Sequence, residues 1–204
     1  MDFQSTLFVD TDAPTLDFGS LERRELTSGA WVDVVRAWLP QPDDVFATLA
    51  ADVPWRSERR QMYDRVVDVP RLTYTYMIGE PLPHPTLAQA RETLTAHYRA
   101  ELGEPFRTAG CCYYRDGRDS VAWHGDTIGR GSTQDTMVAI VSVGDPRRLA
   151  LRPRAGGDSI AIEMGHGDLV VMGGSCQRTW EHAVPKVAGA GPRMSVQFRP
   201  VNVF

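Results

Sequence analysis

The second half of the sequence constrains the fold most, because it is a series of short strand-like segments separated by turns. Clusters such as Gly144-Asp-Pro146 and Gly173-Gly174 provide the turn signals, and no long helical pattern interrupts the series. Many short strands without intervening helices favour a double-sheet jelly roll. The candidate strands are Cys111–Tyr114, Val121–His124, Thr136–Val143, Arg147–Arg152, Ser159–Glu163, Asp168–Met172, Thr179–His182 and Arg193–Phe198.

The first half supplies the helices. Pro42 and the acidic residues after it predict a helix over Asp43–Ala51, and Thr86 is expected to cap a second helix that reaches Leu102. Strands are expected over Ala30–Trp38 and Leu72–Ile78, and residues 1–25 read as an irregular arm. The expected fold class is therefore α+β and mainly β, a double-stranded β-helix with the N-terminal helices packed on one sheet.

Length and charge narrow the class of protein. A chain of 204 residues with 42% hydrophobic residues suits one domain over 1–204, with the jelly-roll core at 111–200. The net charge of −4 excludes a global basic field of the kind that drives unspecific nucleic-acid binding. Three cysteines without a CxxC pair, and no signal-peptide or membrane-spanning pattern, predict a cytoplasmic protein with no membrane partner. The arginine-rich composition suggests a bacterial source, and we expect a monomer.

A His-x-Asp pair ends one of the candidate strands. Because side chains alternate along a strand, His124 and Asp126 are expected to point to the same side. His182, in a later strand, could close a triad of two imidazoles and one carboxylate. This is the ligand set that holds non-haem Fe(II) and leaves coordination positions open.

The last candidate strand adds two arginines to this picture. Arg193 and Arg199 are an even number of residues apart and should share one face. A guanidinium fits a carboxylate bidentately, and 2-oxoglutarate carries two carboxylates. Cys112 and Tyr114 also share a face, and the Tyr114 hydroxyl could complete the hydrogen bonds to such a co-substrate.

The segment Arg56–Arg71 is rich in arginine and surrounds Met62-Tyr63. It can be interpreted as a solvated hairpin loop, or as a basic element with an aromatic tip that contacts a polyanion. Three histidines outside the triad, His84, His97 and His166, are not expected to bind metal.

Several stretches in a fixed order resemble the AlkB-like Fe(II)/2-oxoglutarate-dependent dioxygenases, and most of all their branch that repairs duplex DNA. Together they cover most of Cys112–Arg199 and extend upstream of it. The matching stretches are Val69–Tyr76, Tyr114–Gly117, Asp119–Asp126, Gly167–Met172, Gln177–Lys186 and Pro192–Arg199.

The resemblance implies that His124, Asp126 and His182 bind Fe(II) and that Arg193 binds the distal carboxylate of 2-oxoglutarate. Tyr114, Cys112 and Arg199 would complete the co-substrate pocket. Such enzymes consume 2-oxoglutarate and O2, release succinate, and hydroxylate N-methyl groups that then leave as formaldehyde. The implied partner is alkylated DNA, with RNA as the alternative.

The resemblance also assigns a substrate-recognition lid to residues 56–80. Duplex-acting relatives insert a bulky side chain into the base stack here, which predicts that Met62 and Tyr63 act as a wedge. Arg71 would contact the DNA backbone, Tyr76 would line the base pocket, and Tyr74 would also bind the substrate. Beyond the lid, Thr127 and Trp180 are also expected to bind the substrate. For Trp180, burial in the core is an equal alternative.

Two departures from the family pattern bear on cofactor and substrate. Cys112 replaces an asparagine of the family and is a much weaker hydrogen-bond donor. Thr127-Ile128 replaces acidic residues that could pair with a cationic methylated base. The same chemistry on RNA, protein or a small molecule is therefore an alternative, and so is a catalytically silent nucleic-acid-binding module.

Overall fold

A large antiparallel sheet forms the centre of the protein in the computed structural model. The structure describes residues 16–62 and 65–203, and within these ranges it describes all side chains except those of residues 58–68. Eight strands form it in the order β1-β2-β10-β7-β12-β5-β4-β3. The strands are β1 (Glu22–Glu25), β2 (Ala30–Val35), β3 (Arg56–Met62), β4 (Arg65–Tyr76), β5 (Thr108–Tyr114), β7 (Val138–Gly144), β10 (Leu169–Gly174) and β12 (Arg193–Arg199).

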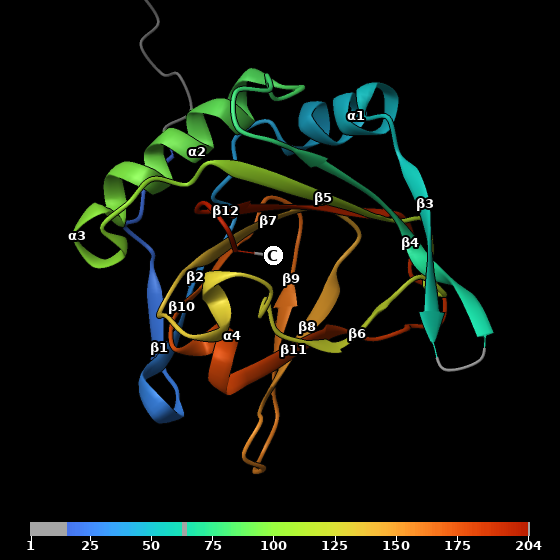
Figure 1. Cartoon of the computed structure of the whole chain (residues 1–204). Coiled ribbons are helices and arrows are strands. Elements are labelled where there is room, and N and C mark those ends of the chain that lie inside the picture. The colour runs from blue at the N-terminus through green and yellow to red at the C-terminus, as the bar shows by residue number, and fades with distance from the viewer. Residues whose placement is uncertain (1–15, 63–64, 204) are drawn as a thin grey trace, which may run out of the picture.

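A smaller sheet lies below the large one in Figure 1 and completes the double-stranded β-helix. Its four strands follow the order β6-β11-β8-β9, and all of their pairings are antiparallel. This arrangement confirms the predicted fold class. The strands are β6 (Val121–His124), β8 (Arg147–Pro153), β9 (Ile160–Met164) and β11 (Trp180–Val184).

Helices cover the other face of the large sheet, on the side away from β6, β8 and β11 (Figure 1). They are α1 (Pro42–Asp52), α2 (Pro85–His97) and α3 (Arg99–Leu102). The cap of α2 was predicted wrongly, because the ring of His84, and not Thr86, accepts a hydrogen bond at its start. None of the helices among the described residues has the length and apolar character needed to span a membrane.

Strand β12 shows how one strand serves two layers. Its side chains alternate, so Met194, Val196 and Phe198 join the core under the helices. The other face of β12 points between the two sheets and carries polar side chains, among them the buried Arg193 and Gln197. A second apolar cluster fills the space between the sheets around this polar row.

Four short elements were not predicted. The strand β1 lies within the arm that was expected to be irregular. All of its residues are charged, so no apolar pattern indicated a strand. It pairs with β2, and this pairing includes an ion pair from Arg23 to Asp33 at 2.7 Å. A short helix α4 (Cys176–Thr179) precedes β11, and two 3-10 turns occur at Thr27–Gly29 and Arg130–Ser132. The remainder of the predicted arm, residues 1–15, lies outside the described residues.

The arginine-rich segment forms a β-hairpin at one edge of the large sheet. β3 pairs with β4 in antiparallel register, and Met62 stands opposite Arg65. β4 thus begins at Arg65, before the strand predicted from Leu72. The sequence did not indicate this start, because charged and apolar residues alternate too irregularly here to show a period of two. Tyr63 lies outside the described residues.

Candidate metal centre and the adjoining cavity

Three potential metal ligands come together at one end of the small sheet. His124 ends β6, and its cross-strand partner in β11 is His182, with ring centroids 4.2 Å apart. Asp126 follows two residues after β6, and its Oδ1 lies 3.8 Å from Nε2 of His124. One ligand atom from each residue lies within 4.8 Å of the others. The three residues predicted from the sequence are thus close enough to share one ion.

Both histidines are held in the form that binds metals. Nδ1 of His124 lies 2.9 Å from the carbonyl oxygen of Ala122, which can only accept, so Nδ1 carries the proton and Nε2 is left with a lone pair. Burial lowers the pKa of both imidazoles, that of His182 to about 3. Neutral rings need no deprotonation before they bind an ion.

Asp126 is fixed by contacts from two other elements. Its Oδ2 accepts from Nε of Arg199 at 2.7 Å, and its backbone N–H donates to Oε1 of Gln177 at 2.9 Å. Burial alone would raise the pKa of Asp126, but the charge and the hydrogen bond of Arg199 outweigh it and hold the pKa at about 2. Gly125 allows this approach, since a Cβ there would lie 2.4 Å from the Gln177 carbonyl.

The donor set fits iron. Two neutral imidazoles and one ionised carboxylate on adjoining elements are the ligands of non-haem Fe(II) sites, which leave positions open for other ligands. The contacts behind His124 and Asp126 orient these ligands, as partners of metal ligands usually do.

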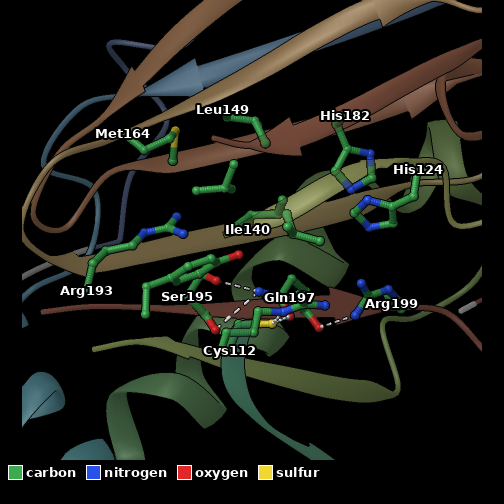
Figure 2. Close-up of a pocket in the computed structure, with 14 residues that line it drawn as sticks. Cys112, His124, Ile140, Leu149, Met164, His182, Arg193, Ser195, Gln197 and Arg199 are labelled. Carbon is green, nitrogen blue, oxygen red and sulfur yellow. Dashed lines mark hydrogen bonds between the residues drawn. The ribbon is translucent and has the colours of Figure 1, made fainter. Parts of the chain in front are cut away.

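A cavity of about 70 Å³ extends from the histidines between the two sheets (Figure 2). Its walls are apolar on the side of the small sheet and polar on the side of β12 and β5. The lining residues are Arg71, Cys112, Tyr114, Val121, His124, Ile140, Leu149, Met164, His182, Val184, Arg193, Ser195, Gln197 and Arg199.

Arg193 occupies the end of the cavity far from the histidines in Figure 2. The side chain is buried with 3% exposure, and its Nε donates to Oγ of Ser142 at 3.0 Å. No carboxylate among the described residues forms an ion pair with it, and burial lowers its pKa. A buried cation without an anion is costly, which makes this position suited to an anionic ligand.

Tyr114 forms the wall next to Arg193. Guanidinium carbons of Arg193 and Arg147 lie 5.1 and 5.5 Å from the centre of its ring. Burial raises the pKa of Tyr114 to about 12, so the phenol stays neutral and can donate a hydrogen bond. Arg147 is itself buried and donates to the carbonyl oxygens of Asp119 and Pro185.

Tyr74 and Tyr76 were expected to bind the substrate, Tyr76 as part of the base pocket, but the structure places both outside the cavity lining. Both pack into the core cluster under the helices and contact each other at a centroid distance of 4.9 Å. The reason is their position in β4, where Arg71 faces the cavity and Tyr74 and Tyr76, an odd number of residues away from it, face the helices. Arg71, predicted to contact DNA backbone, lies on the cavity face.

The other residues predicted to contact substrate lie outside the cavity lining or outside the description. Trp180 is buried between the sheets, where its Nε1 donates to the carbonyl of Thr27, so it does not wall the cavity. Thr127 follows Asp126 and is half-buried. The side chains of Met62 and Tyr63 lie outside the described residues.

Three side chains of the site were not foreseen. Gln197 and Ser195 could have been found from their even spacing to Arg193 in the last strand. Gln177 gave no signal, because it reaches Asp126 from the short helix α4, which no pattern predicted.

Comparison with known proteins agrees with this geometry. Residues 38–199 match the model of the 2OG-Fe(II) oxygenase superfamily. The chain is 33% identical over 187 residues to the alpha-ketoglutarate-dependent dioxygenase alkB homolog 3 of Bos taurus, covering 80% of this chain and 63% of that protein. The Homo sapiens protein of the same name is 31% identical over 191 residues, covering 84% and 64%. The chain thus spans less than two thirds of the length of these relatives.

Other relatives are more distant. The DNA oxidative demethylase ALKBH2 of Arabidopsis thaliana is 30% identical over 134 residues, covering 54% of this chain and 43% of that protein. An oxidoreductase of the 2OG-Fe(II) oxygenase family from Burkholderia pseudomallei has a TM-score of 0.58 at 13% identity, covering 82% and 84% of the two chains. The structure of OsALKBH1 has the same TM-score at 14% identity, covering 87% and 99%. The family uses Fe(II) and 2-oxoglutarate with O2, and the present chain belongs to it as an AlkB-like member of the 2OG-Fe(II) oxygenase superfamily.

Proposed function

We propose that this protein is an Fe(II)- and 2-oxoglutarate-dependent dioxygenase that demethylates alkylated bases in DNA. One observation carries the proposal: His124 and His182 of the triad line the same cavity as Arg193, which is buried and has no carboxylate partner among the described residues. A metal ion with open coordination positions and the Arg193 cation, which requires a carboxylate partner, would thus share one cavity. A co-substrate with a carboxylate at each end would satisfy both.

The residues of the chain then have distinct tasks. His124, Asp126 and His182 would hold Fe(II), which when bound supplies the oxidising chemistry with 2-oxoglutarate and O2. Arg193 and the neutral phenol of Tyr114 would bind the distal carboxylate. Arg199 keeps Asp126 ionised and oriented. The apolar wall on the side of the small sheet would limit the access of water to the reacting groups.

Two observations support DNA as the substrate. Relatives that match the chain include a protein named as a DNA oxidative demethylase. The β3–β4 hairpin projects from the edge of the large sheet and carries Arg56, which is exposed. Such a hairpin could hold a duplex while a base is turned out toward the metal. RNA, a protein or a small molecule would be oxidised by the same machinery, and the assay below separates DNA from RNA and from substrates that are not nucleic acids.

The test is turnover by Fe(II)-loaded protein with 2-oxoglutarate and O2 on methylated single- and double-stranded DNA and RNA oligonucleotides. Succinate and formaldehyde are measured together. We expect formaldehyde in proportion to the methylated base, and its loss in His124→Ala but not in His166→Gln, whose ring lies outside the cavity. Succinate without formaldehyde on every oligonucleotide would move the substrate away from nucleic acid. Binding of DNA with neither product would indicate a silent module.

A further inference from the structure

Arg71 is an unexpected member of the cavity lining. It lies in β4, where Leu72 pairs with Tyr113 and Thr73 with Cys112 of the neighbouring strand. Its Nε donates to the Cys112 sulfur at 3.4 Å, so the guanidinium lies over the inner face of β5 and not along the outer edge of the hairpin. This places a third arginine in the same space as Arg193 and Arg199.

The side of the cavity formed by β5 and β12, here called its floor, has few strong hydrogen-bond donors beside Cys112. A thiol donates weakly, and Sγ of Cys112 lies 3.8 Å from Oε1 of Gln197. The Gln197 amide nitrogen donates to Oγ and O of Ser195, at 2.6 and 3.2 Å, which leaves its oxygen to face Cys112. An anionic ligand beside Cys112 would therefore meet only a weak donor, the Cys112 thiol, and an acceptor, the Gln197 amide oxygen, from the floor. The guanidinium of Arg71 is the strong donor there.

The space beside Cys112 is also where a co-substrate held by Arg193 would extend. Cys112 stands opposite Ser195, two residues along β12 from Arg193 in the direction of Arg199. Two residues of a strand span about 6–7 Å. A five-carbon dicarboxylate that starts at Arg193 and continues toward His124 therefore passes Cys112.

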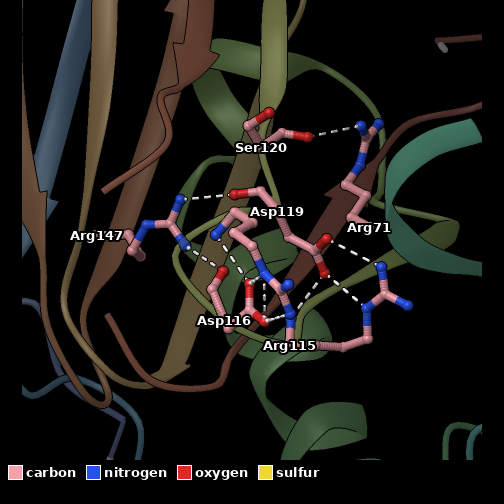
Figure 3. Close-up of polar contacts among 7 residues, drawn as sticks. Arg71, Arg115, Asp116, Asp119, Ser120 and Arg147 are labelled. Carbon is pink, nitrogen blue, oxygen red and sulfur yellow. Dashed lines mark hydrogen bonds and ion pairs between the residues drawn. The ribbon is translucent and has the colours of Figure 1, made fainter. Parts of the chain in front are cut away.

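A second contact fixes Arg71 relative to the metal ligands. Its Nη1 donates to the Ser120 carbonyl at 3.4 Å (Figure 3). The Ser120 N–H donates in turn to the Pro70 carbonyl at 2.7 Å. Ser120 directly precedes β6, the strand that ends in His124. The guanidinium is thereby held between the strand that carries a ligand and the floor of the cavity.

We propose that Arg71 binds the co-substrate, donating from the side of Cys112 the hydrogen bonds that this cysteine supplies only weakly. The inference rests on the proposed function, since it takes 2-oxoglutarate as the ligand of the cavity. It replaces the contact with the DNA backbone that the sequence predicted for Arg71. Arg71 and Cys112 would then bind 2-oxoglutarate together.

The test is a double-mutant cycle on 2-oxoglutarate binding, measured by calorimetry on Mn(II)-loaded protein under argon so that no turnover is needed. Hydrogen bonds to charged groups are strong enough that Arg71→Met should raise the Kd for 2-oxoglutarate about tenfold or more. Arg71→Lys keeps the charge without the planar fork and should raise it less. Arg56→Met, on the same hairpin but outside the cavity lining, should leave it unchanged.

The second arm of the cycle uses Cys112→Asn, which restores a strong donor. We expect this variant to bind 2-oxoglutarate at least as tightly as the parent, and Arg71→Met to cost about threefold or less in its background. An equal loss in both backgrounds, or no loss in either, would overturn the proposal. So would a matching loss of Mn(II) affinity, because Arg71 would then act only through Ser120 and β6. Failure of the unaltered protein to bind 2-oxoglutarate would instead refute the proposed function.

Discussion

Arg193→Met should raise the stability of the ligand-free protein and lower its affinity for 2-oxoglutarate. Arg193 is 3% exposed, donates to the hydroxyl of Ser142 at 3.0 Å, and has no carboxylate partner among the described residues. Burial lowers its pKa, which shows that the fold bears a cost for the cation. If this cost is offset only by a bound carboxylate, the free protein should gain stability when the charge is removed and should lose its ligand.

The magnitudes follow from the burial. Methionine is long and apolar, so it keeps much of the packing. Replacing a buried ion pair by apolar residues stabilises proteins by up to about 1–4 kcal/mol, and we expect a gain within this range when the unpaired cation is removed. For a chain of 204 residues, each kcal/mol raises Tm by about 2–4 °C. Truncating one partner of a buried charge pair costs about 2–5 kcal/mol of binding, which is a rise in Kd of about 30-fold or more.

Thermal unfolding by circular dichroism without ligand gives the first quantity, and calorimetry with 2-oxoglutarate and Mn(II) gives the second. Arg152→Met is the matched control, because Arg152 is exposed on the small sheet and pairs with Glu181 at 2.7 Å. Both quantities should stay near the parent values there. A lower Tm for Arg193→Met, or an unchanged Kd, would refute the reasoning, since the cation would then be compensated within the protein itself.

Three further predictions concern substrate and stability. Thr127→Asp should raise formaldehyde release from cationic 1-methyladenine relative to neutral N3-methylthymine by about tenfold, because a carboxylate pairs with the cation; an unchanged ratio would place Thr127 away from the base. Alanine at both Met62 and Tyr63 should reduce turnover on duplex DNA more than on single strands, and equal losses would exclude a wedge. His97 is packed against Phe18 at a centroid distance of 3.6 Å, and burial lowers its pKa below 6.5. The unfolded chain therefore takes up the proton first, and stability should fall as pH drops below about 6.5. In His97→Phe that slope should weaken, as urea unfolding at several pH values would show.

The parts of the site that lie within regular strands could be predicted from the sequence. His124 ends a strand of the expected bounds, and the even spacing of Arg193 and Arg199 does place both on the cavity face of β12. Strand period alone was enough for these positions. It could not show that Arg199 binds Asp126, because Asp126 lies beyond the end of β6 and its placement depends on the distant Gln177.

Strand period failed where the facing direction of a strand had to be known as well. Alternation in β4 is visible in the sequence, but which set of residues faces the cavity is decided by the register with β5. A shift of one residue exchanges Tyr74 and Tyr76 for Arg71 and Thr73. The aromatic side chains attracted the prediction of a base pocket, whereas the register buries them under the helices.

The candidate metal centre depends on the contact between the two sheets. His124 and His182 belong to neighbouring strands of the small sheet, while Asp126 is tied through Arg199 to β12 of the large sheet. The same strand β12 packs Val196 and Phe198 against the helices on its other face. Because cores are close-packed, a change in helix packing is transmitted to β12 and hence to the third ligand. Affinity for the metal should therefore respond to mutations in the helical layer, even though no helix residue lines the cavity.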